Sequence, residues 1–286
     1  MSILVVTDSV ASIPADILGE LGIDVVSLYI NDGDTNQREL EMDIPAFYRR
    51  LADLQALPTS SQPSVEELLT SFRGAVERGS DVIGVFISEK MSGTLQTARL
   101  AAEMIRGEFP GTRIELIDSG SNSMEEGFGA IAAARAARAG ETIERCVTAA
   151  QETLRRTRYL FTPHTLEYLR RGGRIGGASA LVGGLLQIKP ILTVEEGAVV
   201  TFAKVRTQSR ALAEISHKLA EDISAYGLKQ VVVHYIVDRD SAQIYAREQI
   251  EPLAGGPVRV IPVSPLIGVH VGPAIGVVYE TERDWA

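Results

Sequence analysis

Three segments that lie far apart in the chain place hydroxyl groups or a histidine beside a glycine or a proline. They span residues 59–64, 88–94 and 264–273, and each has the composition of a turn. Hydroxyls and backbone N–H groups are neutral donors, and hydrogen bonds to an ionised carboxylate are among the strong ones in proteins. If the segments meet, they form a site for one carboxylate. Its candidate binding residues are Ser60, Ser61, Ser92, Thr94 and His270.

These residues also have an ordinary structural interpretation. Ser60, Ser61 and Ser64 precede an expected helix at residues 65–77, where serine commonly occupies a turn or caps the first helical turn. We expect Ser64 to act only as a cap. A single histidine beside a glycine, such as His270, is more often a local hydrogen-bonding residue than a catalytic base.

A serine hydrolase that acts on lipid esters is the enzymatic alternative. Ser92, His270 and Asp8 are the residue types of a nucleophile, base and acid triad. However, residues 91–94 lack the G-x-S-x-G turn that exposes such a nucleophile, so we expect no catalytic residue. The other histidines lack metal-ligand spacing, and we therefore expect no metal. They are His164, His217 and His234.

Two glycine motifs resemble nucleotide-binding fingerprints without meeting their requirements. Residues 127–132 fit G-x-G-x-x-A, but nine residues separate them from the preceding expected strand, and the fingerprint needs a tight strand-to-helix turn. Residues 172–179 have the spacing of a phosphate-binding loop, but Ala178 replaces the required lysine. We expect helix packing at the first motif and no bound cofactor.

Composition limits the classes of partner. The chain has 286 residues, 45% of them apolar, which suffices for one large or two medium domains. Its formal charge of −9 and pI near 5.1 disfavour nucleic acid, which carries one negative charge every ~1.7 Å of duplex. No apolar run reaches the ~20 residues of a membrane helix, and no targeting signal is evident. Cys146, the one cysteine, is expected to be buried, and we expect a soluble, cytoplasmic protein.

The first half of the chain alternates strand-like and helix-like segments, which is typical of a parallel, Rossmann-like α/β sheet. Segments that follow strands should share one rim, where ligands of such sheets bind. These segments are residues 7–9, 88–94 and 118–121. The expected strands are residues 3–6, 25–29, 82–87 and 114–117, and the expected helices are 14–21, 44–52, 65–77, 93–107 and 126–139.

The second half predicts an α+β domain. A hairpin is expected at residues 191–202, and the domains are expected at 1–156 and 157–286. The glycine-rich residues 172–186 are either a tightly packed loop or the wall of an apolar cavity. The expected strands are 159–162, 189–194, 199–205, 230–235, 258–262 and 277–280, with helices at 165–171, 208–225 and 241–250.

Eight short segments in order resemble the DegV family, whose members bind fatty acids for a separate fatty acid kinase. Each is weak alone, and together they span the chain. Two depart from the family pattern: Ser60 stands where the family has threonine, and Ala274 follows Gly272-Pro273 where it has glycine. The segments are residues 6–9, 60–64, 91–94, 117–119, 166–175, 189–191, 204–207 and 270–276.

The resemblance implies a two-domain α/β protein that holds the carboxylate of a long-chain fatty acid between its domains, with Ser92 as a carboxylate-binding serine. The partner kinase would phosphorylate that carboxylate to an acyl phosphate, which this non-enzymatic subunit would carry into phospholipid metabolism; transient membrane contact is compatible with that role. Arg174, Lys204 and Arg206 would then stabilise the transferred charge or contact the kinase. The alternative interpretation of these three residues is that they are solvated surface charges. For the protein as a whole, a third functional class beside the lipid carrier and the hydrolase is an interaction module that binds no lipid.

Overall fold

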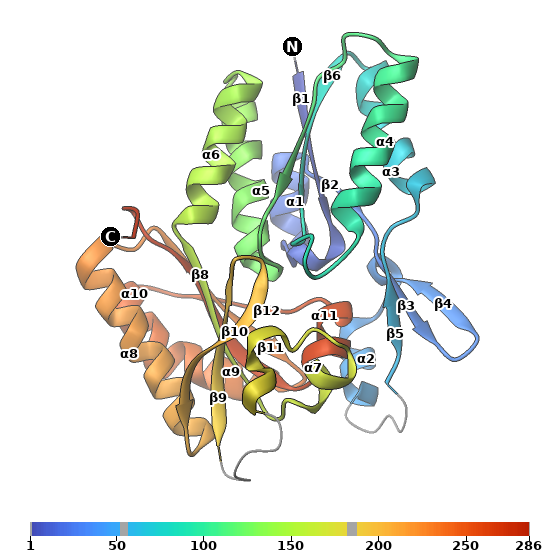
Figure 1. The fold of residues 1–286 in the computed structure, drawn as a ribbon. Helices are drawn as coiled ribbons and strands as arrows, with labels where there is room; N and C mark the ends of the chain where they lie inside the picture. The colour runs from blue at the N-terminus through green and yellow to red at the C-terminus, as the bar shows by residue number, and fades with distance from the viewer. Residues whose placement is uncertain (1, 52–56, 182–187, 286) are drawn as a thin grey trace. The chain divides into compact units, whose positions relative to one another are not determined.

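The computed structural model describes residues 2–51, 57–181 and 188–285, and it divides into two compact units. The first consists of Met1–Glu41 and Ser60–Arg155, and the second of Met42–Thr59 and Arg156–Ala286 (Figure 1). A short segment from the first half of the chain thus belongs with the second half. The domain limits 1–156 and 157–286 stay a prediction.

A parallel four-stranded sheet in the order β2-β1-β6-β7 forms the centre of the first unit. Its two central strands, β1 and β6, are rich in β-branched residues and are buried along most of their length, as expected for a sheet covered on both faces. The prediction of a parallel α/β sheet is confirmed. The strands are β1 Ser2–Asp8, β2 Asp24–Val26, β6 Ser80–Phe86 and β7 Ile114–Asp118.

Helices cover both faces of this sheet. In Figure 1 the sheet stands between α3 and α4 on one side and α5 and α6 on the other. Phe72 of α3 and Phe86 of β6 are fully buried in the core between them. Ser64 caps α3 by accepting the Glu67 N–H, as predicted. The helices are α1 Ala15–Leu21, α3 Val65–Glu77, α4 Thr94–Glu108, α5 Ser123–Arg138 and α6 Ile143–Arg155.

The G-x-G motif of α5 serves close packing. A Cβ built on Gly127 would lie 2.7 Å from the Ala11 carbonyl oxygen, and one on Gly129 would lie 2.8 Å from Leu154 of α6. Only glycine permits both approaches, which confirms the prediction of helix packing at this motif. Cys146 of α6 is buried, as expected, and burial raises the pKa of its thiol.

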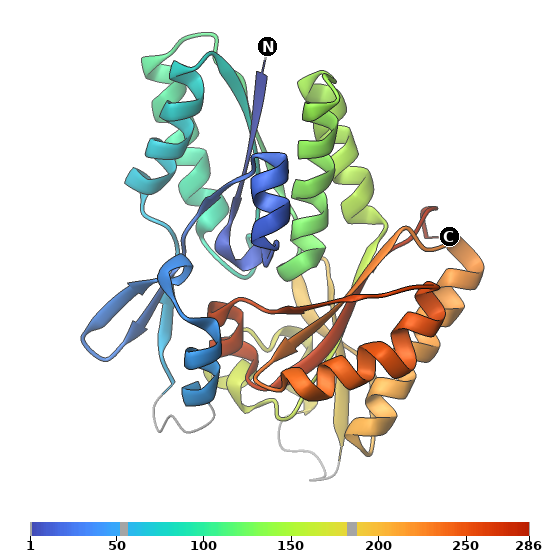
Figure 2. The same ribbon diagram turned by 180° about the vertical axis from the view of Figure 1, so that it is seen from behind.

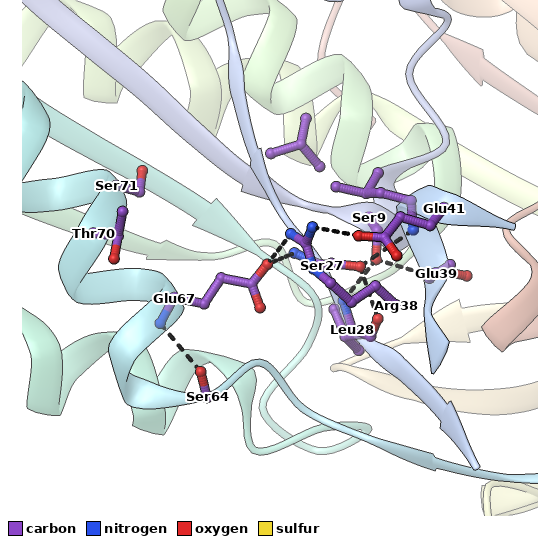
Figure 3. Close-up of polar contacts among 12 residues, drawn as sticks. Ser9, Ser27, Leu28, Arg38, Glu39, Glu41, Ser64, Glu67, Thr70 and Ser71 are labelled. Carbon is purple, nitrogen blue, oxygen red and sulfur yellow. Dashed lines mark hydrogen bonds and ion pairs between the residues drawn. The ribbon is translucent and has the colours of Figure 1, made fainter. Parts of the chain in front are cut away.

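A small second sheet with the order β4-β3-β5 was not predicted. The expected strand at residues 25–29 is wrong, because β2 ends at Val26 and a separate strand begins at Tyr29. Glu67 of α3 fixes this region by accepting bonds from the Ser27 N–H, the Tyr29 hydroxyl and Arg38; Figure 3 shows the pair that it forms with Arg38. The strands are β3 Tyr29–Asp32, β4 Thr35–Arg38 and β5 Thr59–Ser61.

The second unit contains a six-stranded sheet in the order β10-β9-β8-β13-β11-β12. It is antiparallel except for the pair β11–β12, so the expected α+β organisation and the β9–β10 hairpin are both confirmed. The strands are β8 Thr157–Pro163, β9 Lys189–Glu195, β10 Ala198–Val205, β11 Gln230–Ile236, β12 Arg259–Pro262 and β13 Ala274–Glu280.

Helices α8 and α9 share one core with this sheet (Figure 2), in which Ile215 of α8 and Tyr245 of α9 pack with Tyr279 of β13. Residues 264–273 were expected to form a turn, and this is wrong: most of them form helix α11, capped by Ser264. The helices are α2 Ile44–Leu51, α7 Glu167–Arg171, α8 Gln208–Tyr226, α9 Arg239–Tyr245, α10 Glu251–Ala254 and α11 Pro265–Val271, and a π-helical turn, Ala246–Ile250, continues α9.

Most residues in the described part of the glycine-rich segment are exposed, and the segment packs closely at one point. Its 3₁₀ helix Gly176–Leu181 lies on β10, where a Cβ on Gly176 would overlap the Val199 carbonyl oxygen. The alternative, the wall of an apolar cavity, stays a prediction, and residues 182–186 of this segment lie outside the described residues. Within the described ranges no helix has both the length and the apolar character to cross a membrane.

Candidate functional site

The carboxyl ends of β1, β6 and β7 meet at one rim of the parallel sheet, as the sequence predicted. Asp8 accepts the Ile87 N–H at 3.0 Å, and the Ser88 N–H donates to the Ser121 carbonyl at 2.8 Å. The Ser119 N–H donates to the Phe86 carbonyl at 3.0 Å. The three loops after these strands are therefore joined by direct hydrogen bonds, at the edge where parallel sheets bind ligands.

Ser92 and Thr94 present a pair of hydroxyls at the start of α4. Their oxygens lie 2.9 Å apart, and the Ser92 oxygen accepts the Thr94 N–H at 3.3 Å. Gly93 is the N-cap residue of this 15-residue helix, whose amino-terminal N–H groups and dipole favour an anion. Thr94 is buried and Ser92 is half-buried. The pair thus offers uncharged donors where the helix contributes partial positive charge.

Gln62 joins the segment of Ser60 and Ser61 to this helix start. Its side-chain amide donates to the Thr97 hydroxyl at 2.6 Å, and that hydroxyl donates to the Gly93 carbonyl at 3.2 Å. A Cβ on Gly93 would overlap the Gln62 oxygen, so glycine is needed for this close approach. Two of the three predicted segments are therefore held together within the first unit.

Ser60 and Ser61 are half-buried and lie in strand β5 rather than in the turn that was expected. Sequence reasoning did not single out Gln62. The run Ser61-Gln62-Pro63-Ser64 before a helix indicates a cap, and only the fold shows that the glutamine reaches a second helix.

His270 lies in the last turn of α11 in the second unit and is buried, with 9% of its surface exposed. A Cβ on Gly172 would overlap its Nδ1, so the end of α7 packs directly on the imidazole. Burial and the charge of Arg174 lower the pKa of His270 to about 4. The sequence left open whether His270 donates a hydrogen bond or supplies charge. A neutral imidazole at pH 7 favours the first role.

Two tyrosines fix the helix that carries His270. The Tyr48 hydroxyl of α2 donates to the Val263 carbonyl at 2.5 Å, and a Cβ on Gly268 would lie 2.8 Å from the Tyr48 ring. The Tyr168 ring of α7 packs in the same way on Gly272, which ends the helix with a φ of +70°. This packing explains why residues 42–59 belong to the second unit.

The three predicted basic residues are exposed side chains of the second unit. Arg174 donates to the Gly172 carbonyl at 2.8 Å, and its charge acts on His270. Lys204 lies near the end of β10, and Arg206 precedes Thr207, the N-cap residue of α8. For Lys204 and Arg206 the structure does not distinguish a residue that contacts a partner from a solvated surface charge.

The triad of a serine hydrolase gains no support in the first unit. Both Asp8 oxygens accept backbone N–H groups, from Val10 and Ile87 at 3.0 Å each. Ser92 bonds to Thr94 rather than lying in a nucleophile elbow. Neutral hydroxyl donors at a helix start are chemically suited to an anion, and the predicted role of this cluster stays a prediction.

A polar cleft of about 490 Å³ lies elsewhere in the first unit, between α3 and strands β2 to β4. Its lining includes charged side chains, and the Arg38 guanidinium forms ion pairs with both Glu67 and Glu41 (Figure 3). None of the predicted site residues lines it. An apolar ligand has no reason to enter a cleft of this kind.

Comparison with known proteins identifies the family. The model of the DegV family, a family described as uncharacterised, matches residues 2–282. The chain belongs to the DegV family. A DegV domain-containing protein of Clostridium acetobutylicum is 39% identical over 285 residues, which cover 99% of each chain.

Two solved DegV structures share the fold and are described as fatty-acid binding. The Thermus thermophilus protein is 35% identical, with a TM-score of 0.86 over 98% of this chain and 100% of its own. The Bacillus subtilis protein is 30% identical, with a TM-score of 0.87 over 98% of this chain and 99% of its own. The α/β architecture that the sequence predicted is therefore that of DegV proteins.

Proposed function

We propose that this DegV protein binds a long-chain fatty acid and holds its carboxylate with Ser60, Ser61, Ser92, Thr94 and His270. The observation that carries the proposal is the hydroxyl pair of Ser92 and Thr94 at the start of α4, with the β5 serines tied to the same helix by Gln62. The fatty-acid binding described for the Thermus and Bacillus relatives supports it.

The energetics of such a ligand match these residues. Burial of one methylene contributes about 0.8 kcal/mol, so a chain of about fourteen gives roughly 11 kcal/mol before ordering costs. A buried carboxylate without partners is heavily penalised. Hydroxyl donors, the amino-terminal N–H groups of α4 and the neutral imidazole of His270 would satisfy its oxygens.

Purified protein is expected to contain fatty acid. Mass spectrometry of a denatured extract should find about one long-chain fatty acid per chain, and oleate added to stripped protein should raise the melting temperature. A ligand that binds only the native state adds about 2.7 kcal/mol of stability at a roughly hundredfold excess over its Kd. A methyl ester of the same length is the control for the carboxylate. An empty extract with no thermal shift would favour an interaction module, and Ser92-dependent ester turnover would favour the hydrolase.

We propose further that the bound carboxylate is phosphorylated by a separate fatty acid kinase and that the chain, itself not an enzyme, carries the acyl phosphate. A cation beside the acceptor stabilises charge in phosphoryl transfer. Arg174, exposed and within electrostatic reach of His270, supports this scheme. The kinase would supply the nucleotide site, and a cytoplasmic location fits such a carrier.

Replacement of Arg174 by alanine should separate binding from transfer. Oleate affinity is expected to stay within a few fold, because a carboxylate held by neutral donors does not depend on this exposed cation. Acyl phosphate formation with a DegV-associated fatty acid kinase should fall at least tenfold. Arg210→Ala, an exposed arginine on α8, is the control. Equal losses in both assays would place Arg174 in the binding site and contradict the division of roles.

A further inference from the structure

Two buried carboxyl groups adjoin the segment Ser88–Thr94. The proposed binding of a fatty acid assigns no role to them. Asp8 ends β1 and Glu126 lies in the first turn of α5, and neither has exposed surface. The Glu126 Oε1 accepts the Thr7 hydroxyl at 3.0 Å, and its carboxyl also hydrogen-bonds the Asp8 carboxyl. Since two carboxylates cannot donate to each other, this bond requires a proton between them.

The surroundings keep that proton in place. Burial raises the pKa of Asp8 to about 7 and the pKa of Glu126 well above its usual range, and the charge of Asp8 raises the latter further. Glu39, which accepts a bond from the Ser9 hydroxyl (Figure 3), acts on Asp8, and Asp118 acts on Glu126. Both neighbours are acidic and oppose ionisation of the pair.

The position of the proton follows from the hydrogen bonds. Both Asp8 oxygens already accept N–H groups, which favours the ionised form of Asp8. The Glu126 Oε2 accepts no hydrogen bond from any residue that the structure describes, so this oxygen is available to carry a proton. Glu126 is therefore the donor, and the pair titrates as one unit.

A chain of hydrogen bonds leads from this pair to Ser92. Asp8 accepts the Ile87 N–H, and Ile87 immediately precedes Ser88. The Ser88 carbonyl accepts the N–H groups of Met91 and Ser92 at 2.9 and 3.1 Å, which closes the turn before α4. The placement of the Ser92 hydroxyl thus depends on the position of the Asp8 carboxylate.

We propose that Glu126, protonated against Asp8, is a positioning residue that holds the turn from Ile87 to Thr94, and with it the Ser92 hydroxyl, in place for a carboxylate. The inference rests on the proposed function. Loss of the proton would place two charges in buried contact, and their repulsion would loosen the turn. Ligand affinity should then fall as the pH rises.

The direction of the stability change is fixed by linkage. An unfolded glutamate ionises near pH 4.3, whereas the folded pair keeps its proton to a much higher pH. Between these two pH values the folded state binds more protons than the unfolded state. The free energy of unfolding therefore falls as the pH rises through this range, and the unfolding equilibrium constant increases by up to about tenfold per pH unit. Glu126→Gln retains a donor to Asp8 and an acceptor for Thr7, and it has no proton to lose.

The test compares wild type with Glu126→Gln between pH 6 and 9, using oleate as the probe. The Kd ratio of wild type to variant should be near one at pH 6 and at least about tenfold at pH 9; the ratio cancels the ionisation of oleate itself. In wild type, hydrogen exchange at the Ile87 and Ser92 amides should accelerate with pH by more than the intrinsic exchange rate of an unprotected amide does. In the variant, the acceleration should match that of the intrinsic rate.

Glu125→Gln is the matched control, because Glu125 is an adjacent buried carboxyl that bonds Ser121 instead. It should keep the wild-type pH profile. A Kd ratio that stays constant across the pH range, or identical exchange in wild type and Glu126→Gln, overturns the positioning role. Absence of oleate binding by wild type at every pH refutes the proposed function itself, and the exchange profiles then still show whether the pair holds the turn.

Discussion

Ser92→Ala is expected to weaken oleate binding roughly ten- to a hundredfold. The change removes one donor from a desolvated carboxylate, and a hydrogen bond to a charged group contributes about 1.5–3 kcal/mol. His270→Ala should weaken binding of the same head group. If both side chains bind one carboxylate, the loss in the double variant should differ from the sum of the single losses by about 0.5 kcal/mol or more. Titration calorimetry of the four proteins measures this coupling.

A fatty alcohol of equal chain length provides the control ligand. Its head group is uncharged, so either substitution should affect it far less than oleate. Ser92 belongs to the first unit and His270 to the second, 178 positions later in the chain. Strict additivity of the two losses, or an equal loss for the alcohol, would show that the two residues do not share a carboxylate.

Periodic, apolar elements could be read from the sequence. Three of the four parallel strands of the first unit, β1, β6 and β7, and the helix at Val65–Glu77 follow from β-branched runs and from a serine cap before an amphipathic repeat. The rim that joins the loops after β1, β6 and β7 followed from the general rule for parallel sheets. For these elements the local pattern was sufficient.

Strand β4 and helix α11 were missed for different reasons. Strand β4, Thr35–Arg38, is polar and mostly exposed, so it carries no alternation to detect. Helix α11 was mistaken for a turn because Pro265 and Gly268 resemble turn residues. Its start does carry a signal: Ser264 as N-cap followed by proline at the first helical position is a common helix opening.

Contacts between particular side chains of distant segments could not be predicted. The carboxyl pair of Asp8 and Glu126 joins residues 118 positions apart, and nothing in either local sequence distinguishes a buried glutamate from an exposed one. The assignment of residues 42–59 to the second unit likewise depends on Tyr48 reaching Val263. Chemistry of single residues was predictable, and their partners were not.

Gly172→Ala is expected to lower the free energy of unfolding of the second unit by about 1–3 kcal/mol, because a new Cβ would overlap the His270 imidazole. The backbone does not oppose alanine here, since Gly172 has a φ of −73°. The displaced imidazole should also weaken oleate binding about as much as His270→Ala does. Trp285, the only tryptophan, is partly buried and packs against the core of this unit, so its fluorescence should report the unfolding.

The decisive comparison is the same substitution in the His270→Ala background. Removal of the imidazole removes the overlapping atom, so Gly172→Ala should then cost no stability, and it should add about 0.4–1 kcal/mol by restricting the unfolded chain. Gly107→Ala in α4, where a Cβ has open space, is the control for that gain. If Gly172→Ala destabilises both backgrounds equally, the glycine is needed for a reason other than His270, and the close packing of α7 on the imidazole does not position it.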